Sequence, residues 1–146
     1  MTVRVQAEDF DLGAEAEALG AGGATGAVVT FTGLVRGGAD DVEAMTLEHY
    51  PGMTEAALEE IEARAMARWP LTGALIIHRV GRLLPGERIM MVATASPHRK
   101  AAFEAAEFLM DYLKTRAPFW KKEEVGGEGR WVDAREEDDA AAERWR

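Results

Sequence analysis

Three basic side chains lie at the predicted start of a long helix. The segment Ser96-Pro97-His98-Arg99-Lys100 precedes a run in which polar residues recur at helical spacing. The first turn of a helix presents free backbone N–H groups and the positive end of the helix dipole, so basic side chains beside it favour a bound anion such as phosphate. Pairing of His98 and Arg99 with nearby carboxylates explains the pattern equally well.

A second basic segment, Lys114-Thr115-Arg116-Ala117-Pro118-Phe119-Trp120-Lys121-Lys122, lies at the predicted end of the same helix. Basic residues near a helix C-terminus complement the helix dipole and commonly do nothing more. Lys121 and Lys122 differ, because they follow on a predicted strand whose neighbouring side chains point to opposite faces. At most one of these two lysines therefore shares a pocket with a given partner group.

Cysteine is absent from all 146 residues. This absence excludes thiolate zinc sites, iron–sulfur clusters and cysteine nucleophiles, so any sulfur chemistry needs a sulfur atom from outside the chain. His49, His78 and His98 are too scattered to predict a metal site, and we expect neither a metal nor a cofactor. Arg36 stands where a predicted buried strand gives way to a Gly-rich loop, a common position for a ligand-binding side chain.

The formal net charge of −9 argues against non-specific binding to nucleic acid or to anionic membranes. The charge is unevenly distributed, because residues 79–135 hold 11 basic and 8 acidic side chains. No stretch approaches the ~18 apolar residues of a membrane span, and the N-terminal sequence lacks the pattern of a signal or transit peptide. These features predict a cytoplasmic protein that binds neither nucleic acid nor membrane.

Two principal helices are predicted to position the basic residues. One begins at Thr54 as N-cap and ends before Pro70, and the other has Ser96 as N-cap and Pro97 in its first position. Strands and a short helix surround them. The strands cover residues 2–6, 27–35, 45–50, 74–80, 88–95, 119–125 and 130–135, and the short helix runs from Asp9 or Asp11 to Leu19.

The order of these elements is not a regular βαβ alternation and predicts an α+β fold with mainly antiparallel sheet. Strands 27–35 and 45–50 flank a loop, which suggests that they pair with each other. We expect a single domain, residues 1–146, that ends in an acidic tail at 136–146, either helical or frayed.

Several segments closely resemble one known family, that of the catalytic large subunit of molybdopterin synthase. They are GAVVTFTGLVR (26–36), LEHYPGMTEAAL (47–58), HRVGRLLPGE (78–87), SPHRKAAFEAAEFLMDYLKTRAPFWKKE (96–123) and GRWVDAR (129–135). The resemblance implies an α/β-hammerhead-like fold with additional antiparallel sheet.

The resemblance also implies an activity and partners. Members of the family are sulfurtransferases that convert cyclic pyranopterin monophosphate (precursor Z) into molybdopterin by forming its dithiolene. The sulfur arrives as a thiocarboxylate on the C-terminal Gly-Gly of a small ubiquitin-like subunit. Two large subunits form a central homodimer, with a small subunit at each end of the resulting heterotetramer.

The family motifs assign roles to individual residues. Lys114 of DYLK and Lys121 of PFWK are implied as the catalytic pair. The implied substrate-binding residues are Arg36, His98, Arg99 and Arg135, with Lys122, Glu123 and the backbone of Leu34 and Val35 as pocket edges. Because the family's pocket draws on both protomers, Arg135 is expected to serve the neighbouring chain's site.

Two alternatives remain at this point. A noncatalytic anion-binding scaffold for a ubiquitin-like partner would keep the fold without turnover, although retention of both lysines and of His98-Arg99 counts against it. A phosphate-ester hydrolase would need a metal site or a nucleophile, and the sequence offers neither in a recognisable form.

Overall fold

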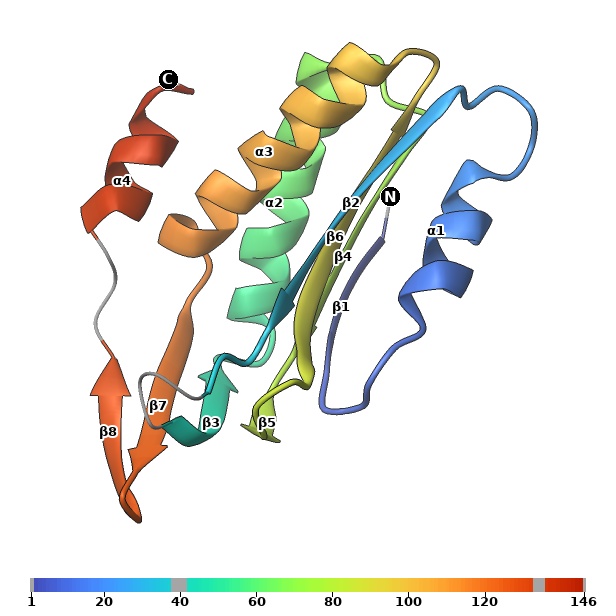
Figure 1. The fold of residues 1–146 in the computed structure, drawn as a ribbon. Coiled ribbons are helices and arrows are strands. Elements are labelled where there is room, and N and C mark those ends of the chain that lie inside the picture. Colours follow the sequence, from blue (N-terminus) through green and yellow to red (C-terminus); the bar gives the residue numbers. More distant parts are fainter. Residues whose placement is uncertain (1, 38–41, 133–135, 146) are drawn as a thin grey trace.

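The computed structural model describes residues 2–37, 42–132 and 136–145. Strands and helices alternate irregularly along the chain (Figure 1). The strands are β1 (Thr2–Gln6), β2 (Ala27–Leu34), β3 (Val42–His49), β4 (Gly73–Arg79), β5 (Gly81–Leu83), β6 (Arg88–Ser96), β7 (Phe119–Val125) and β8 (Glu128–Val132). The helices are α1 (Leu12–Gly20), α2 (Met53–Arg68), α3 (Arg99–Arg116) and α4 (Glu136–Glu143).

Sheet A has the strand order β1-β4-β6-β2, with β1 parallel to β4 and the other pairs antiparallel. Helix α1 covers one face, and α2 and α3 cover the other (Figure 1). The main core lies under the two long helices, where Ile76 and Val92 of the sheet meet Leu58, Phe108 and Leu109. Every residue of β4 is buried, which explains the apolar run that precedes its final His78 and Arg79.

Sheet B has the strand order β5-β3-β7-β8, and all its pairs are antiparallel. The predicted hairpin of β7 and β8 around Gly126-Gly127 is confirmed. The predicted pairing of β2 with β3 is wrong: β2 pairs with β6, and β3 pairs with β5 and β7. Strand β2 is thus an edge strand beside β6, and β3 lies between β5 and β7, so the neighbours of both are distant in sequence. The α+β class, mainly antiparallel with two principal helices, is confirmed.

Helix α3 begins later than its sequence suggests. His98 has the extended N-cap conformation, and the first helical residue is Arg99, so Pro97 precedes the helix. The Ser96 hydroxyl donates a hydrogen bond to the carbonyl of His98 rather than accepting one from the first turn. The amide of Gly26 donates to the Ser96 carbonyl, and a Cβ at Gly26 would collide with the Pro97 carbonyl. The start of α3 consequently lies against the start of β2.

Thr54 lies inside α2 and does not cap it. Gly52, whose φ of 85° suits glycine, is the N-cap residue. The fully buried Thr54 hydroxyl accepts a hydrogen bond from the Tyr50 amide at 3.0 Å and donates one to the Pro118 carbonyl, also at 3.0 Å. This hydroxyl ties the start of α2 to the corner between α3 and β7.

The acidic C-terminal segment is helical, and α4 packs against α3. Arg144 bridges Glu107 and Asp111 of α3, and the indole N–H of Trp145 donates to Asp111 at 2.6 Å. The Trp145 ring also meets Trp69 and Phe108 edge to face. None of the helices in the described ranges is long and apolar enough to span a membrane.

Candidate functional site

A cavity of about 520 Å³ opens where the end of α3 meets both sheets. We call it the lysine cavity. Its walls come from β2, β3, β4, β6, α3, β7 and β8. The lining residues are Phe31, Thr32, Gly33, Leu34, Met45, Leu47, His78, Ile89, Met90, Leu113, Lys114, Ala117, Phe119, Lys121 and Val132. Mostly apolar walls with two cations, both of them lysines, are typical of a site that binds and orients an anionic ligand.

Lys114 reaches the cavity from the last turns of α3. The apolar face of the helix is buried against sheet A through residues such as Leu109 and Leu113, which fixes the helix. Lys114 follows Leu113 and is exposed at the rim of this buried face. The helix thus fixes the backbone of Lys114, and its four-carbon stem carries the ammonium to the cavity.

Lys121 reaches the same cavity from β7, whose alternation separates it from Lys122. Lys121 pairs in register with Leu47 and Val132, which also line the cavity. Lys122 faces the other side of sheet B, where its ammonium lies 5.7 Å from the centre of the Trp131 ring. The prediction that at most one of these lysines enters a shared pocket is confirmed. Lys122 does not line the lysine cavity.

His78 of β4 lines the cavity and is 5% exposed. Its ring stacks on Phe119 with 3.8 Å between centroids, and Nδ1 lies 2.9 Å from the Arg79 carbonyl. Burial lowers the pKa of His78 to about 4, and the charges of Lys114 and His49 act in the same direction. The imidazole is therefore neutral at physiological pH.

The end of β2 contributes Leu34 to the cavity, and its side chain is largely exposed. Val35 is different: it is buried with Met45 and Leu83, its N–H donates to Glu87, and its carbonyl accepts from Gly86. The backbone of Val35 is thus occupied by the turn before β6. Arg36 is exposed two residues after Leu34.

His98 and Arg99 lie at the opposite end of α3 from Lys114. Fifteen residues separate Arg99 from Lys114, which corresponds to roughly 22 Å along a helix. Both side chains are exposed and neither lines the lysine cavity. Within one chain, the structure therefore brings together Lys114, Lys121 and Leu34 but not His98 or Arg99.

The remaining predicted site residues are Glu123 and Arg135. Glu123 is half-buried on β7, paired in register with Met45 and Arg130, and does not line the cavity. Arg135 lies outside the described residues. Sequence reasoning missed His78 and Phe119, although a histidine that ends a run of four apolar residues in β4 was a usable signal.

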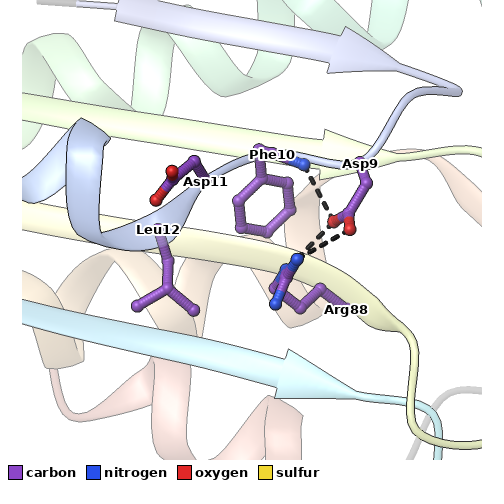
Figure 2. A pocket seen from close by; sticks show the side chains of 5 residues that line it. All are labelled: Asp9, Phe10, Asp11, Leu12 and Arg88. Atoms are coloured by element: carbon purple, nitrogen blue, oxygen red, sulfur yellow. Dashed lines mark hydrogen bonds and ion pairs between the residues drawn. The ribbon is translucent and has the colours of Figure 1, made fainter.

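A second cavity, also about 520 Å³, lies on the α1 side of sheet A (Figure 2). Asp9, Phe10, Asp11, Leu12 and Arg88 line it. The Arg88 guanidinium donates to both carboxylate oxygens of Asp9, at 3.0 and 2.7 Å. This contact lowers the pKa of Asp9, mainly through the hydrogen bond from Arg88. The cation of this cavity is thus already paired with a carboxylate.

The fold and the lysine cavity together define an α+β protein with a candidate ligand site that contains two lysines. Comparison with known proteins makes this more specific. The family model described as MoaE protein matches residues 5–116. A relative from Cereibacter sphaeroides, named molybdopterin synthase catalytic subunit, is 61% identical over 146 residues, covering 99% of this chain and 100% of the relative. The chain belongs to the MoaE protein family.

Solved structures agree with this assignment. The molybdopterin biosynthesis MoaE protein from Burkholderia ambifaria superposes with a TM-score of 0.85 at 59% identity, covering 99% of this chain and 97% of that one. A chain from a complex of subunits 1 and 2 of the molybdopterin-converting factor of Helicobacter pylori has a TM-score of 0.78 at 22% identity, with 91% of each chain covered. The second similarity is one of fold.

Proposed function

We propose that this protein is the catalytic large subunit of a molybdopterin synthase. It transfers sulfur from the C-terminal thiocarboxylate of a small ubiquitin-like subunit to cyclic pyranopterin monophosphate and so forms the dithiolene of molybdopterin. The observation that carries the proposal is the convergence of Lys114 and Lys121 on one cavity in a chain of this family. Since the chain has no cysteine, the transferred sulfur must come from another molecule.

The lysine cavity suits this chemistry. Two ammonium groups attract both an anionic thiocarboxylate and a cyclic phosphate, and apolar walls strengthen these attractions by excluding water. Lys114 orients the thiocarboxylate and stabilises charge that develops on it, and Lys121 anchors the substrate or transfers protons. In each transfer the thiocarboxylate sulfur bonds to a substrate carbon and a C–O bond of that carbon breaks, so that its oxygen leaves with the phosphate as the cyclic ester opens, or as water. Water then cleaves the acyl C–S bond, and the carrier leaves with a carboxylate.

The distance between Arg99 and Lys114 in one chain points to a second copy. Strand β2 is an edge of sheet A and exposes Phe31 and Leu34, and Phe103 of the neighbouring α3 is 60% exposed. A row of large apolar side chains beside an edge strand is suited to pairing with another chain. We assign this surface to the homodimer contact.

Antiparallel pairing of two β2 strands would complete the site. The start of β2 lies beside His98 and Arg99, and its end lies in the lysine cavity. In such a pair, the first residues of the second copy's β2 would lie next to the lysine cavity of this chain. An eight-residue strand spans about 26 Å, which is close to the separation of Arg99 and Lys114 along α3. His98 and Arg99 of one protomer would then bind the phosphate held by the other protomer's lysines, with Arg36 nearby, and the role of Arg135 stays a prediction from the family motif.

The test combines the purified protein with a thiocarboxylated small subunit and cyclic pyranopterin monophosphate. We expect dithiolene product only when all three are present. Product without the small subunit would refute the sulfur source. Binding of the small subunit without product would instead identify a noncatalytic scaffold. A cytoplasmic location and the heterotetramer remain predictions, the latter measurable as the mass of the mixed complex.

A further inference from the structure

His78 of β4 lines the lysine cavity, and the proposed function gives it no role. A buried histidine costs free energy unless its polar atoms are satisfied, which makes the contacts of His78 informative. Its neighbours are Arg79, Phe119 and the cavity itself. Each contact limits what the imidazole can do.

The contact with Arg79 fixes the position of the ring proton. Nδ1 lies 2.9 Å from the Arg79 carbonyl, and a carbonyl oxygen can only accept a hydrogen bond, so Nδ1 carries the hydrogen. The lone pair of the neutral ring is then on Nε2. Because burial keeps the ring neutral down to a pKa of about 4, His78 is a hydrogen-bond acceptor throughout the physiological range.

The stacked Phe119 ring limits the direction from which a donor can approach. It covers one face of the imidazole at 3.8 Å, so a partner reaches Nε2 in the ring plane. Lys114 lines the same cavity, and its charge acts on His78. An ammonium has three N–H donors, so Lys114 can bond the imidazole and a second group at the same time.

We propose that His78 is a positioning residue: when the Lys114 ammonium turns into the lysine cavity, the lone pair on Nε2 of His78 accepts a hydrogen bond from it and aims that group at the substrate. The inference rests on the proposed function only in that Lys114 acts on the substrate. His78 itself does not touch the reacting atoms. Its neutral ring holds Lys114 without adding a third cation to the cavity.

Two amide variants separate this role from a structural one. His78→Asn places an amide near the position of Nδ1 and keeps the donor to Arg79, whereas His78→Gln places one near Nε2 and keeps the acceptor. We expect His78→Asn to lower the single-turnover rate about tenfold, with KM little changed, and His78→Gln to restore most of it. If His78 only anchored the Arg79 carbonyl, the order would be reversed, and that result would overturn the proposal.

A second measurement does not depend on activity. Loss of an acceptor favours the neutral amine, so an amine-directed reagent should label Lys114 about threefold faster in His78→Asn than in the wild type, with His78→Gln unchanged. The exposed Lys100 serves as internal reference, and His49→Asn is the matched histidine control. Equal Lys114 labelling in the wild type and His78→Asn would overturn the proposal.

The two measurements also distinguish a failure of the proposed function from a failure of the role proposed for His78. If the wild-type protein forms no product, the proposed function fails while the labelling result still decides the role of His78. If His78→Asn does not fold, as judged by thermal unfolding, His78→Phe replaces it, because it keeps a ring against Phe119 and lacks the acceptor. The same faster labelling of Lys114 is then expected.

Discussion

The cavities on the two sides of sheet A have the same volume, about 520 Å³, and different electrostatics. On the α1 side, one cation meets two carboxylates, and Arg88 is held by Asp9 (Figure 2). On the α3 side, two lysines from a helix and a strand converge beside a neutral histidine. Volume does not distinguish the two cavities. They differ in their balance of charged side chains, because one has a single cation that is paired with a carboxylate and the other brings two lysines together.

The largest expected effect comes from removing a cation of the lysine cavity. Lys114→Ala and Lys121→Ala should each lower product formation by at least about 100-fold, because each removes charge stabilisation or proton transfer in the reaction. The measurement is dithiolene formation with the thiocarboxylated partner, alongside partner binding, which should persist. Lys122→Ala is the matched control on the other face of β7. A fully active Lys114→Ala protein would contradict the assignment.

The second test asks whether Arg99 of one protomer acts together with Lys114 of the other protomer in catalysis. Arg99→Ala should lower activity about tenfold or more by removing a charged hydrogen bond to the phosphate. When Arg99→Ala and Lys114→Ala subunits are unfolded and refolded together, mixed dimers should regain activity, since one of their two sites combines intact residues. Activity no higher than that of either variant alone would place Arg99 outside the partner's site.

The third test changes the stability of the protein through a buried residue on the α3 side of sheet A that does not line the lysine cavity. Glu62 of α2 is 1% exposed, its Oε2 has no hydrogen-bond partner among the described residues, and burial raises its pKa to about 7. The folded state binds this proton more tightly than the unfolded state does. The free energy of unfolding of the protein therefore falls as the pH rises from about 4.5 to above about 7.

Glu62→Gln mimics the protonated carboxyl group. We expect thermal unfolding near pH 5 to match the wild type, and about 2 kcal/mol of added stability near pH 8. Product formation should be unchanged, because Glu62 does not line the lysine cavity. Glu59→Gln, exposed on the same helix, is the control. A stabilisation that is equal at both pH values would show that Glu62 is not protonated in the folded state.

The smallest effect is expected on the α1 side. Arg88→Ala removes an exposed ion pair with Asp9, and such pairs contribute little to stability. Product formation should stay within about twofold of the wild type, and the thermal midpoint should shift only slightly. A large loss of activity would show that the catalytic site lies on the α1 side of sheet A and not in the lysine cavity.

Local patterns predicted much of the fold. Alternation and apolar runs identified most of the strands, and the spacing in α3 identified its buried face. The pairing of β2 and the helix starts were not predictable in this way. We predicted β3 as the partner of β2 because the two strands are close in sequence. Strand pairing depends instead on contacts between segments far apart in sequence, and β2 packs against α3 and pairs with β6. Ser96 has the right type for an N-cap, but its hydroxyl bonds the His98 carbonyl instead.

The site was predictable only in part. Strand alternation correctly separated Lys121 from Lys122, and the family motif paired Lys121 with Lys114. Spacing could not show that His98 and Arg99 lie a full helix length away, because their motif is contiguous with that of Lys114 in sequence. The sequence did not identify His78 as a site residue, because its proposed role depends on which ring nitrogen donates to the Arg79 carbonyl, and only the structure shows that contact.

The segment Phe119-Trp120-Lys121-Lys122 repeats one chemical pattern, an aromatic ring and a lysine, on both faces of β7. A slip of one residue would put Trp120 and Lys122 where Phe119 and Lys121 now lie, with little change in hydrophobicity or charge. The side chains themselves thus leave the strand's register ambiguous. The hydrogen bond from the Thr54 hydroxyl to the Pro118 carbonyl removes this ambiguity, since it fixes the chain immediately before the repeat begins.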